Sequence, residues 1–71
     1  MLLYEHAEIR EAFASLRPRD RELLWLREVV GLGYADIAGR FSLREGAVRI
    51  AVMRARQRLE EALGERLTDD V

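Results

Sequence analysis

The 71-residue sequence contains no cysteine, so neither a disulfide framework nor a thiolate zinc site is available to it. Its longest apolar runs, such as residues 50–53, are far too short to cross a membrane. A signal peptide needs a basic segment followed by an apolar one, and none occurs in the N-terminal sequence MLLYEHAEIR. We therefore expect a cytoplasmic protein that does not bind membranes and that forms one small domain over residues 1–71.

The sequence also lacks the side-chain combinations that catalysis requires. His6 is the only histidine and has no second ligand nearby, so a surface or packing role is expected for it rather than metal binding. No nucleophile lies beside a base, no loop is built to cradle a phosphate, and Asp36, Glu60 and Glu61 do not form a catalytic pair. We therefore expect no enzyme, no cofactor and no small-molecule substrate.

Lysine is absent as well, because all 12 cationic residues of the chain are arginines. A guanidinium is a planar fork that binds guanine or a phosphate through two hydrogen bonds at once. A genomic base composition that favours arginine codons explains the same bias. The lack of lysine is therefore compatible with nucleic-acid binding but does not decide for it.

The distribution of charge is more informative than the net charge of −1. Residues 1–39 have a balance of −2 and residues 59–71 a balance of −4. Between them, residues 40–58 carry six arginines against Glu45 alone, a balance of +5. Because phosphate binding depends on the local potential, this concentration favours a nucleic-acid partner.

The spacing of apolar residues predicts an all-α fold. Four helices are expected, over about residues 5–16, 18–30, 34–40 and from 44 to beyond 63. Pro18 suits the first turn of the second helix, and Gly31 can supply the left-handed residue at its end. One core is predicted, made of Ile9, Phe13, Leu16, Leu23, Leu26, Ile37, Ala38, Leu43, Val48, Val52, Ala55 and Leu59.

Residues 34–55, YADIAGRFSLREGAVRIAVMRA, have the spacing of a DNA-reading helix-turn-helix. Ile37 and Ala38 lie where a short first helix must pack closely against a second one, and residues 41–43 occupy the turn. The second helix combines a buried stripe with a cationic outer side, formed by Val48, Val52 and Ala55 and by Arg49, Arg54, Arg56 and Arg58. Such a helix suits the major groove of DNA.

Three motifs follow one another in a characteristic order: LRPRDRE at residues 16–22, GLGYADIA at residues 31–38, and GAVR at residues 46–49 with RARQRL at residues 54–59. Together they resemble region 4 of bacterial sigma-70 factors, and within them the extracytoplasmic-function (ECF) group, over about residues 12–63. The resemblance implies a small four-helix domain, related to winged helices but without a wing, whose helix-turn-helix covers about residues 34–63.

In that family, region 4 recognises the −35 promoter element and docks on the flap of the RNA polymerase β subunit. It is also a common target of anti-sigma factors. Region 2, which in the family binds the polymerase clamp and opens the −10 element, has no counterpart in this sequence. The resemblance therefore implies either an excised domain or a small stand-alone protein, with promoter DNA, RNA polymerase and an anti-sigma factor as partners.

The resemblance also implies site residues, position by position. Base contacts are expected from Arg49, Ile50, Met53 and Arg54. The DNA-binding set is completed by Arg44 and by residues expected near backbone phosphates, namely Tyr34, Glu45, Gly46, Ala47 and Arg56. The flap-facing surface is expected among apolar residues of the first two helices, with Phe13, Leu24 and Trp25 as candidates, although core packing explains Trp25 equally well.

This chain departs from the family pattern in the helix that would read DNA. The family usually has Ser or Thr at positions 44, 47 and 50 and often Arg at position 51, where this chain has Arg44, Ala47, Ile50 and Ala51. Ser42 replaces the usual turn glycine and is expected to adopt a left-handed conformation at some cost. Ile50 and Met53 can touch thymine methyl groups but donate no hydrogen bonds, so the preferred DNA sequence cannot be copied from relatives.

Two interpretations from other classes stay open. A LuxR-type output domain shares the pattern of residues 21–38 and also binds DNA, but usually carries a histidine and a lysine in its second helix. A protein-interaction module would bury Ile50 and Met53 against a second copy or an anti-sigma factor. A salt-dependent DNA-binding assay separates these interpretations.

An ordinary solvated face is a further explanation for the arginines of the second helix. It applies best to Arg56 and Arg58, because Glu60 and Glu61 lie within helical reach of them. The scarcity of other acids in residues 40–58 favours the DNA interpretation for the rest.

Overall fold

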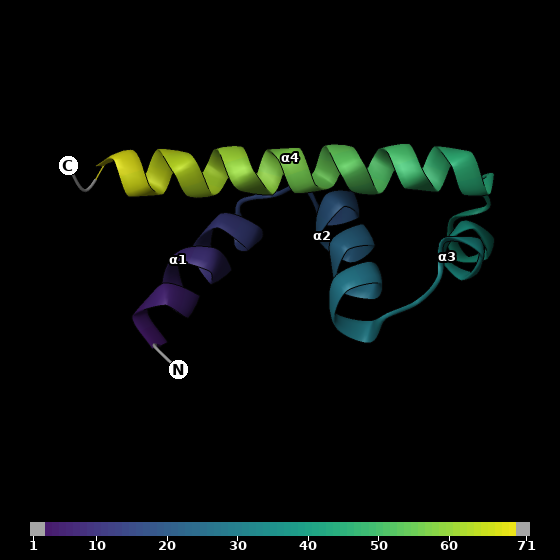
Figure 1. Ribbon diagram of the computed structural model, residues 1–71, viewed down its shortest axis with the longest axis horizontal. Coiled ribbons are helices and arrows are strands. Elements are labelled where there is room, and N and C mark those ends of the chain that lie inside the picture. The colour runs from purple at the N-terminus through teal and green to yellow at the C-terminus, as the bar shows by residue number, and fades with distance from the viewer. Residues whose placement is uncertain (1–2, 70–71) are drawn as a thin grey trace.

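The computed structural model describes the backbone of residues 3–69 and the side chains of residues 7–65. Over these residues the chain forms α1 (Leu3–Ala14), α2 (Pro18–Leu24), the π-helical turn η1 (Trp25–Val30), α3 (Tyr34–Phe41) and α4 (Glu45–Asp69). Helix α4 is a rod of 25 residues, and α1, α2 and α3 all lie along the same side of it (Figure 1). The described backbone contains no strand, and the predicted all-α fold with a helix-turn-helix is confirmed.

The hydrophobic core is the layer between α4 and the shorter helices. Val48, Val52 and Ala55, the predicted inner stripe of α4, are 0% exposed. They form one cluster with the other buried core residues, which are Leu16, Leu23, Leu24, Leu26, Ile37 and Ala38. The edge of the cluster is formed by half-buried residues that include Phe13, Leu43 and Leu59.

The predicted core is wrong at Ile9, which is 46% exposed, whereas Ala12 is fully buried. Helix α1 crosses α4 at an angle, so its N-terminal turns lie away from α4 (Figure 1). Ile9 is on the side of α1 that periodicity predicts, but it lies too close to the N-terminal end of α1 for α4 to cover its side chain. Leu24, considered above as a partner-contacting residue, is only 3% exposed and belongs to the core.

The second predicted helix reaches Val30 as expected, but its last six residues form a π-helix rather than an α-helix. The backbone N–H of Gly31 donates to the carbonyl of Leu26 at 3.0 Å, and Gly31 has a φ of 86°. The left-handed glycine at the end of this helix is therefore confirmed. Within the wide turn Leu26 is buried, whereas Trp25 and Val30 are both 52% exposed.

The turn of the helix-turn-helix depends on Ser42, which has a φ of 56° and is the only described non-glycine residue with a positive φ. The backbone N–H of Leu43 donates to the carbonyl of Ala38 at 2.9 Å, which closes the end of α3 in the manner of a Schellman motif. Leu43 is thereby drawn against the core. Ser42 thus adopts the expected left-handed conformation that glycine adopts at lower cost.

We predict that Val52→Asp unfolds the domain. Val52 is fully buried at the centre of the α4 stripe, and an unpaired buried charge costs several kcal/mol, which is on the order of the total stability of a small domain. Met53→Asp is the matched control, because it introduces the same charge one residue along at a half-exposed position. Thermal unfolding followed by circular dichroism would contradict this description of the core if Val52→Asp melted like the control.

Candidate nucleic-acid interface

The outer face of the first half of α4 carries exposed apolar side chains between two arginines. Ile50 and Met53 are 48% and 49% exposed, and Arg49 and Arg54 are exposed as well. A helix advances about 100° per residue, which places Ile50 and Met53 between Arg49 and Arg54, on the side opposite the buried stripe. The predicted orientation of α4 is therefore confirmed.

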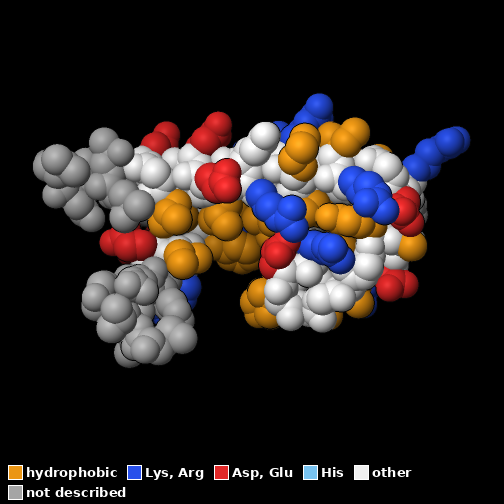
Figure 2. All heavy atoms as spheres, in the orientation of Figure 1, with side chains coloured by type: hydrophobic (Ala, Val, Ile, Leu, Met, Phe, Trp, Pro, Cys, Tyr) orange, Lys and Arg blue, Asp and Glu red, His pale blue; other side chains and the backbone are white. Residues whose placement is uncertain are grey.

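Charge is segregated along α4, as the sequence predicts. In Figure 2 most positive side chains lie over the N-terminal half of α4 and the elements beside it, with a few acidic side chains among them, whereas acidic side chains predominate over its C-terminal half. The apolar side chains lie among the positive ones on this half of the molecule. The resulting surface combines positive charge with exposed apolar contacts, as a helix that reads base edges requires.

One flank of α4 is organised around Tyr34, the first residue of α3. The guanidinium carbons of Arg27 and Arg49 lie over the Tyr34 ring, at 4.2 Å and 4.6 Å from its centroid. Nη2 of Arg49 also donates to Oε2 of Glu45 at 2.9 Å, and Nη1 of Arg27 donates to the carbonyl of Leu32 at 3.0 Å. Both arginines are therefore held in place at the surface before any partner binds.

Arg56 lies farther along this flank and is engaged within the domain. Its Nε donates to Oε2 of Glu28 in η1 at 3.0 Å, and its Nη2 contacts the same oxygen. The hydrogen bond that Arg56 donates to Glu28 stabilises the charged guanidinium and raises the pKa of Arg56 above its ordinary value. The alternative interpretation of Arg56 considered glutamates of its own helix, but the partner in the structure is Glu28, which lies 28 residues away in sequence.

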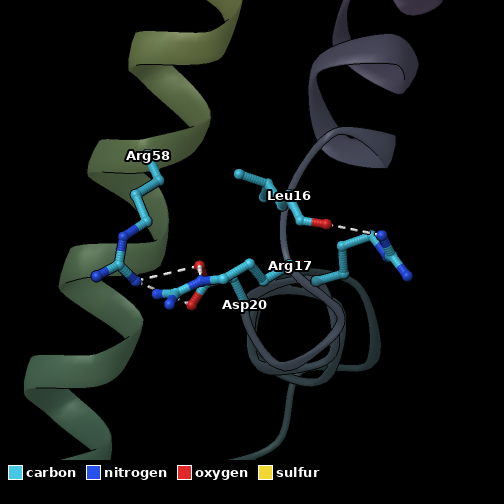
Figure 3. A network of polar contacts seen from close by, with 5 residues as sticks. Leu16, Arg17, Asp20 and Arg58 are labelled. Atoms are coloured by element: carbon cyan, nitrogen blue, oxygen red, sulfur yellow. Dashed lines mark hydrogen bonds and ion pairs between the residues drawn. The ribbon is translucent and has the colours of Figure 1, made fainter.

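Arg58 lies on the opposite flank of α4 and binds Asp20 of α2 (Figure 3). Its Nη1 donates to both carboxylate oxygens of Asp20 at 3.1 Å, and Nε of Arg17 lies 3.6 Å from Oδ2 of the same residue. The Asp20 side chain is only 6% exposed, whereas that of Arg58 is 41% exposed. Arg58 therefore ties α2 to α4, and its partner is Asp20 rather than Glu60 or Glu61, which the alternative interpretation considered.

The residues considered for partner binding lie in different surroundings. An apolar groove of about 400 Å³ opens beside α1, η1 and α4, and its lining includes Ile9, Phe13, Leu24 and Val29. Phe13 is half-buried in it, and Leu24 forms part of its floor. Trp25 is half-exposed and does not line the groove.

The described residues include no group of three or more His, Cys, Asp or Glu side chains able to hold a metal ion. The side chain of His6 lies outside the described residues. None of the helices, over the part of the chain that the structure describes, combines the length and apolar character needed to span a membrane.

These features can be compared with known protein families. The family model described as "Sigma-70, region 4" matches residues 6–59, which include most of α1, all of α2, η1 and α3, and more than half of α4. The chain belongs to the sigma-70 region 4 family. Region 4 is a DNA-binding domain of sigma factors, which act with RNA polymerase in transcription, and it is not a catalytic family. Neither curated proteins nor solved structures provide a match.

Three further arginines of this region 4 domain lie beside the candidate interface, although the sequence motifs did not indicate them as site residues. Arg27 stacks on Tyr34, and Arg17 and Arg19 lie at the start of α2 next to Ile50 and Arg54. They come from outside the helix-turn-helix segment, so its local pattern does not include them. The signal that was available is the LRPRDRE motif, whose three arginines precede the helix-turn-helix in sequence.

We predict that the two partners of the Asp20–Arg58 ion pair contribute unequally to the stability of this region 4 domain. Arg58→Met should lower the free energy of unfolding by about 3 kcal/mol, because it leaves the buried Asp20 carboxylate without its main partner. Asp20→Asn should cost only about 1 kcal/mol, because the half-buried Arg58 can turn to water. Arg54→Met, a control on the same flank without a described partner, should stay within about 0.5 kcal/mol of the parent. Urea denaturation measures all three, and equal losses for Arg58→Met and Asp20→Asn would contradict the asymmetry.

Proposed function

We propose that this region 4 domain recognises the −35 promoter element through the outer face of α4, as part of a sigma factor of the ECF group. The observation that carries the proposal is the exposure of Arg49, Ile50, Met53 and Arg54 on a helix whose opposite side is fully buried. The family match favours this function over the LuxR-type alternative.

The base-reading chemistry follows from the side chains on this face. Arg49 and Arg54 each offer a fork that binds the O6 and N7 atoms of guanine in the major groove. Ile50 and Met53 lie between them and offer apolar contact to thymine methyl groups. A site with guanines flanking a thymine-containing centre is the sequence that this arrangement favours.

The start of α4 is suited to a backbone phosphate. The first helical hydrogen bond of α4 runs from the N–H of Val48 to the carbonyl of Arg44, at 3.1 Å. The N–H groups of residues 45–47 therefore have no partner within the helix and point toward its N-terminal end. We expect Glu45, Gly46 and Ala47 to bind phosphate through these N–H groups, with Arg44 and the hydroxyl of Tyr34 beside them.

Arg56 is expected to contribute less than these residues. Its guanidinium is already bound to Glu28, so a phosphate contact would have to replace or share that interaction. Because the Glu28 carboxylate also offsets much of its charge, Arg56 is the weakest member of the proposed phosphate-binding set.

The apolar groove beside α1 supports docking on the β flap of RNA polymerase. Its lining is predominantly apolar, with Glu28, Arg56 and Glu60 at the rim. Of the three candidates, Phe13 and the buried Leu24 line this groove, whereas Trp25 is exposed and does not line it. An apolar groove with a charged rim is a common form of helix-binding site, and an anti-sigma factor is a competing occupant.

We predict that DNA binding passes through Arg49 and Arg54 and weakens steeply with salt. A duplex is first selected from a random library with the 71-residue chain, and affinities are then measured over a range of salt concentrations. Arg49→Ala and Arg54→Ala should each weaken the free energy of binding to the selected duplex by about 1–3 kcal/mol and relax the sequence preference at one base pair. Selection of no sequence, or unchanged binding by both variants, would refute the assignment of this face to DNA.

We predict that Ile50→Ser changes binding while leaving the fold nearly intact. Ile50 is half-exposed, so its replacement should shift the free energy of unfolding by no more than about 0.5 kcal/mol. Loss of a thymine methyl contact should alter the selected sequence at one position. The protein-interaction alternative predicts a different result, in which the DNA affinity is unchanged and self-association or binding to a partner protein is lost.

A further inference from the structure

A second groove, distinct from the apolar one, lies between the start of α2 and the first half of α4. Its volume is about 530 Å³, and four arginines contribute to its lining: Arg17, Arg19, Arg54 and Arg58. We infer that this groove binds a backbone phosphate of the DNA strand opposite the one that passes the Tyr34 flank. The inference rests on the proposed function, because the groove would bind the second strand of a DNA duplex that α4 already binds.

The groove has a surplus of positive charge that the fold does not use. Asp20 is the one acid in its lining, and both carboxylate oxygens of Asp20 accept hydrogen bonds from Arg58. Arg17 adds a second cation within 3.6 Å of the same carboxylate. Arg19 and Arg54 make no ion pair or side-chain hydrogen bond within the described residues, and both are exposed. Because Arg54 is assigned to a base in the proposed complex, Arg19 is the guanidinium that stays available to an external anion, and Arg54 adds its charge beside it.

The groove is continuous with the proposed base-reading face. Ile50 and Arg54 belong to that face and also line the groove, so the groove begins where the outer face of α4 ends. Arg49 and Arg54 lie roughly 140° apart around the helix axis, which places them on opposite flanks of α4. Tyr34 and Arg27 accompany Arg49 on one flank, and Arg17 and Arg19 accompany Arg54 on the other.

The dimensions of DNA give this two-sided arrangement a consequence. The major groove is about 12 Å wide, and a helix with its side chains has a diameter of about 10–12 Å. A helix that enters the groove therefore has one phosphate backbone along each flank. The Tyr34 flank would face one strand, and Arg19 with Arg54 would face the other.

An acidic polypeptide offers similar charge complementarity but fits the observations less well. Ala47 and Ala51 give the floor of the groove small side chains, and the apolar groove on the other side of the molecule offers larger apolar surface. An acidic peptide would also give no reason for the arginine-lined groove to be continuous with the base-reading face at Ile50 and Arg54. Phosphate is therefore the anion that the position and the chemistry favour together.

Arg19→Gln is the most direct test, because Arg19 makes no described contact that the fold would lose. The selected duplex is measured with the 71-residue chain and with this variant over a range of salt concentrations. The variant should bind about two- to fivefold more weakly, by a similar factor on selected and random duplexes. The slope of log affinity against log salt should fall by about 0.9, as expected for one lost phosphate contact.

Neutral methylphosphonate substitutions, introduced one at a time into the selected duplex, identify the strand. The parent chain should lose affinity at phosphates on both strands, and Arg19→Gln should lose its sensitivity at positions on one strand only. Arg10→Gln is the matched control, because it removes the same charge from an exposed position on α1, outside the groove. It should preserve the parent pattern on both strands.

The possible outcomes separate this inference from the proposed function. If Arg49→Ala weakens binding but Arg19→Gln leaves both the salt slope and the methylphosphonate pattern unchanged, the groove does not bind phosphate and the proposed function stands. An equal effect of Arg10→Gln on the salt slope and pattern would likewise overturn the inference, since net charge alone would explain it. If an oligoglutamate peptide binds with dependence on Arg19 while the DNA measurements do not change, the groove belongs to an acidic polypeptide instead. Failure of Arg49→Ala and Arg54→Ala to alter binding would overturn the proposed function itself.

Discussion

The structure depends on the single apolar stripe of α4. Val48, Val52 and Ala55 belong to the core cluster, and α1, α2 and α3 all pack against α4, so each shorter helix takes its position from the same helix. A domain of 71 residues has little core to spare, and burying one side chain of this size contributes about 1.5–3 kcal/mol. Because the stripe fixes the rotation of α4, it also decides which of its residues face outward.

The arginines of this domain serve two different purposes. Arg58 holds α2 against α4 through the buried Asp20, and Arg56 holds η1 through Glu28. Arg54 and Arg19 are exposed and have no described partner, so their charge is left to the surface. A motif of closely spaced arginines can thus contain structural and surface cations side by side, as RARQRL does at residues 54–59.

Local rules predicted much of this fold. The glycine at the end of the second helix, the left-handed Ser42 and the outward direction of Ile50 all follow from the conformation of a few neighbouring residues. The order of motifs also identified the family that the family model shows. These features were predictable because each depends on backbone geometry or helical periodicity within one segment.

The features that sequence reasoning missed depend on segments far apart in the chain. The partner of Arg58 lies 38 residues away, so no helical spacing indicates it. The exposure of Ile9 follows from the angle at which α1 crosses α4, and the groove lined by Arg19 and Arg54 forms only when α2 docks on α4. The apolar pattern also gives no sign that residues 25–30 form a π-helical turn rather than a continued α-helix.

The ion pair between Arg49 and Glu45 has a consequence for how the domain distinguishes DNA sequences. The guanidinium of Arg49 is already hydrogen-bonded to Glu45 at 2.9 Å in the free domain, so in the proposed complex a contact with a base would replace that hydrogen bond. In that complex a guanine would replace the lost interaction with two hydrogen bonds, whereas opposite a base without suitable acceptors Arg49 can keep its contact with Glu45. Glu45 would therefore give Arg49 an alternative partner, and only a base that binds the guanidinium better than the carboxylate does would draw Arg49 away from it.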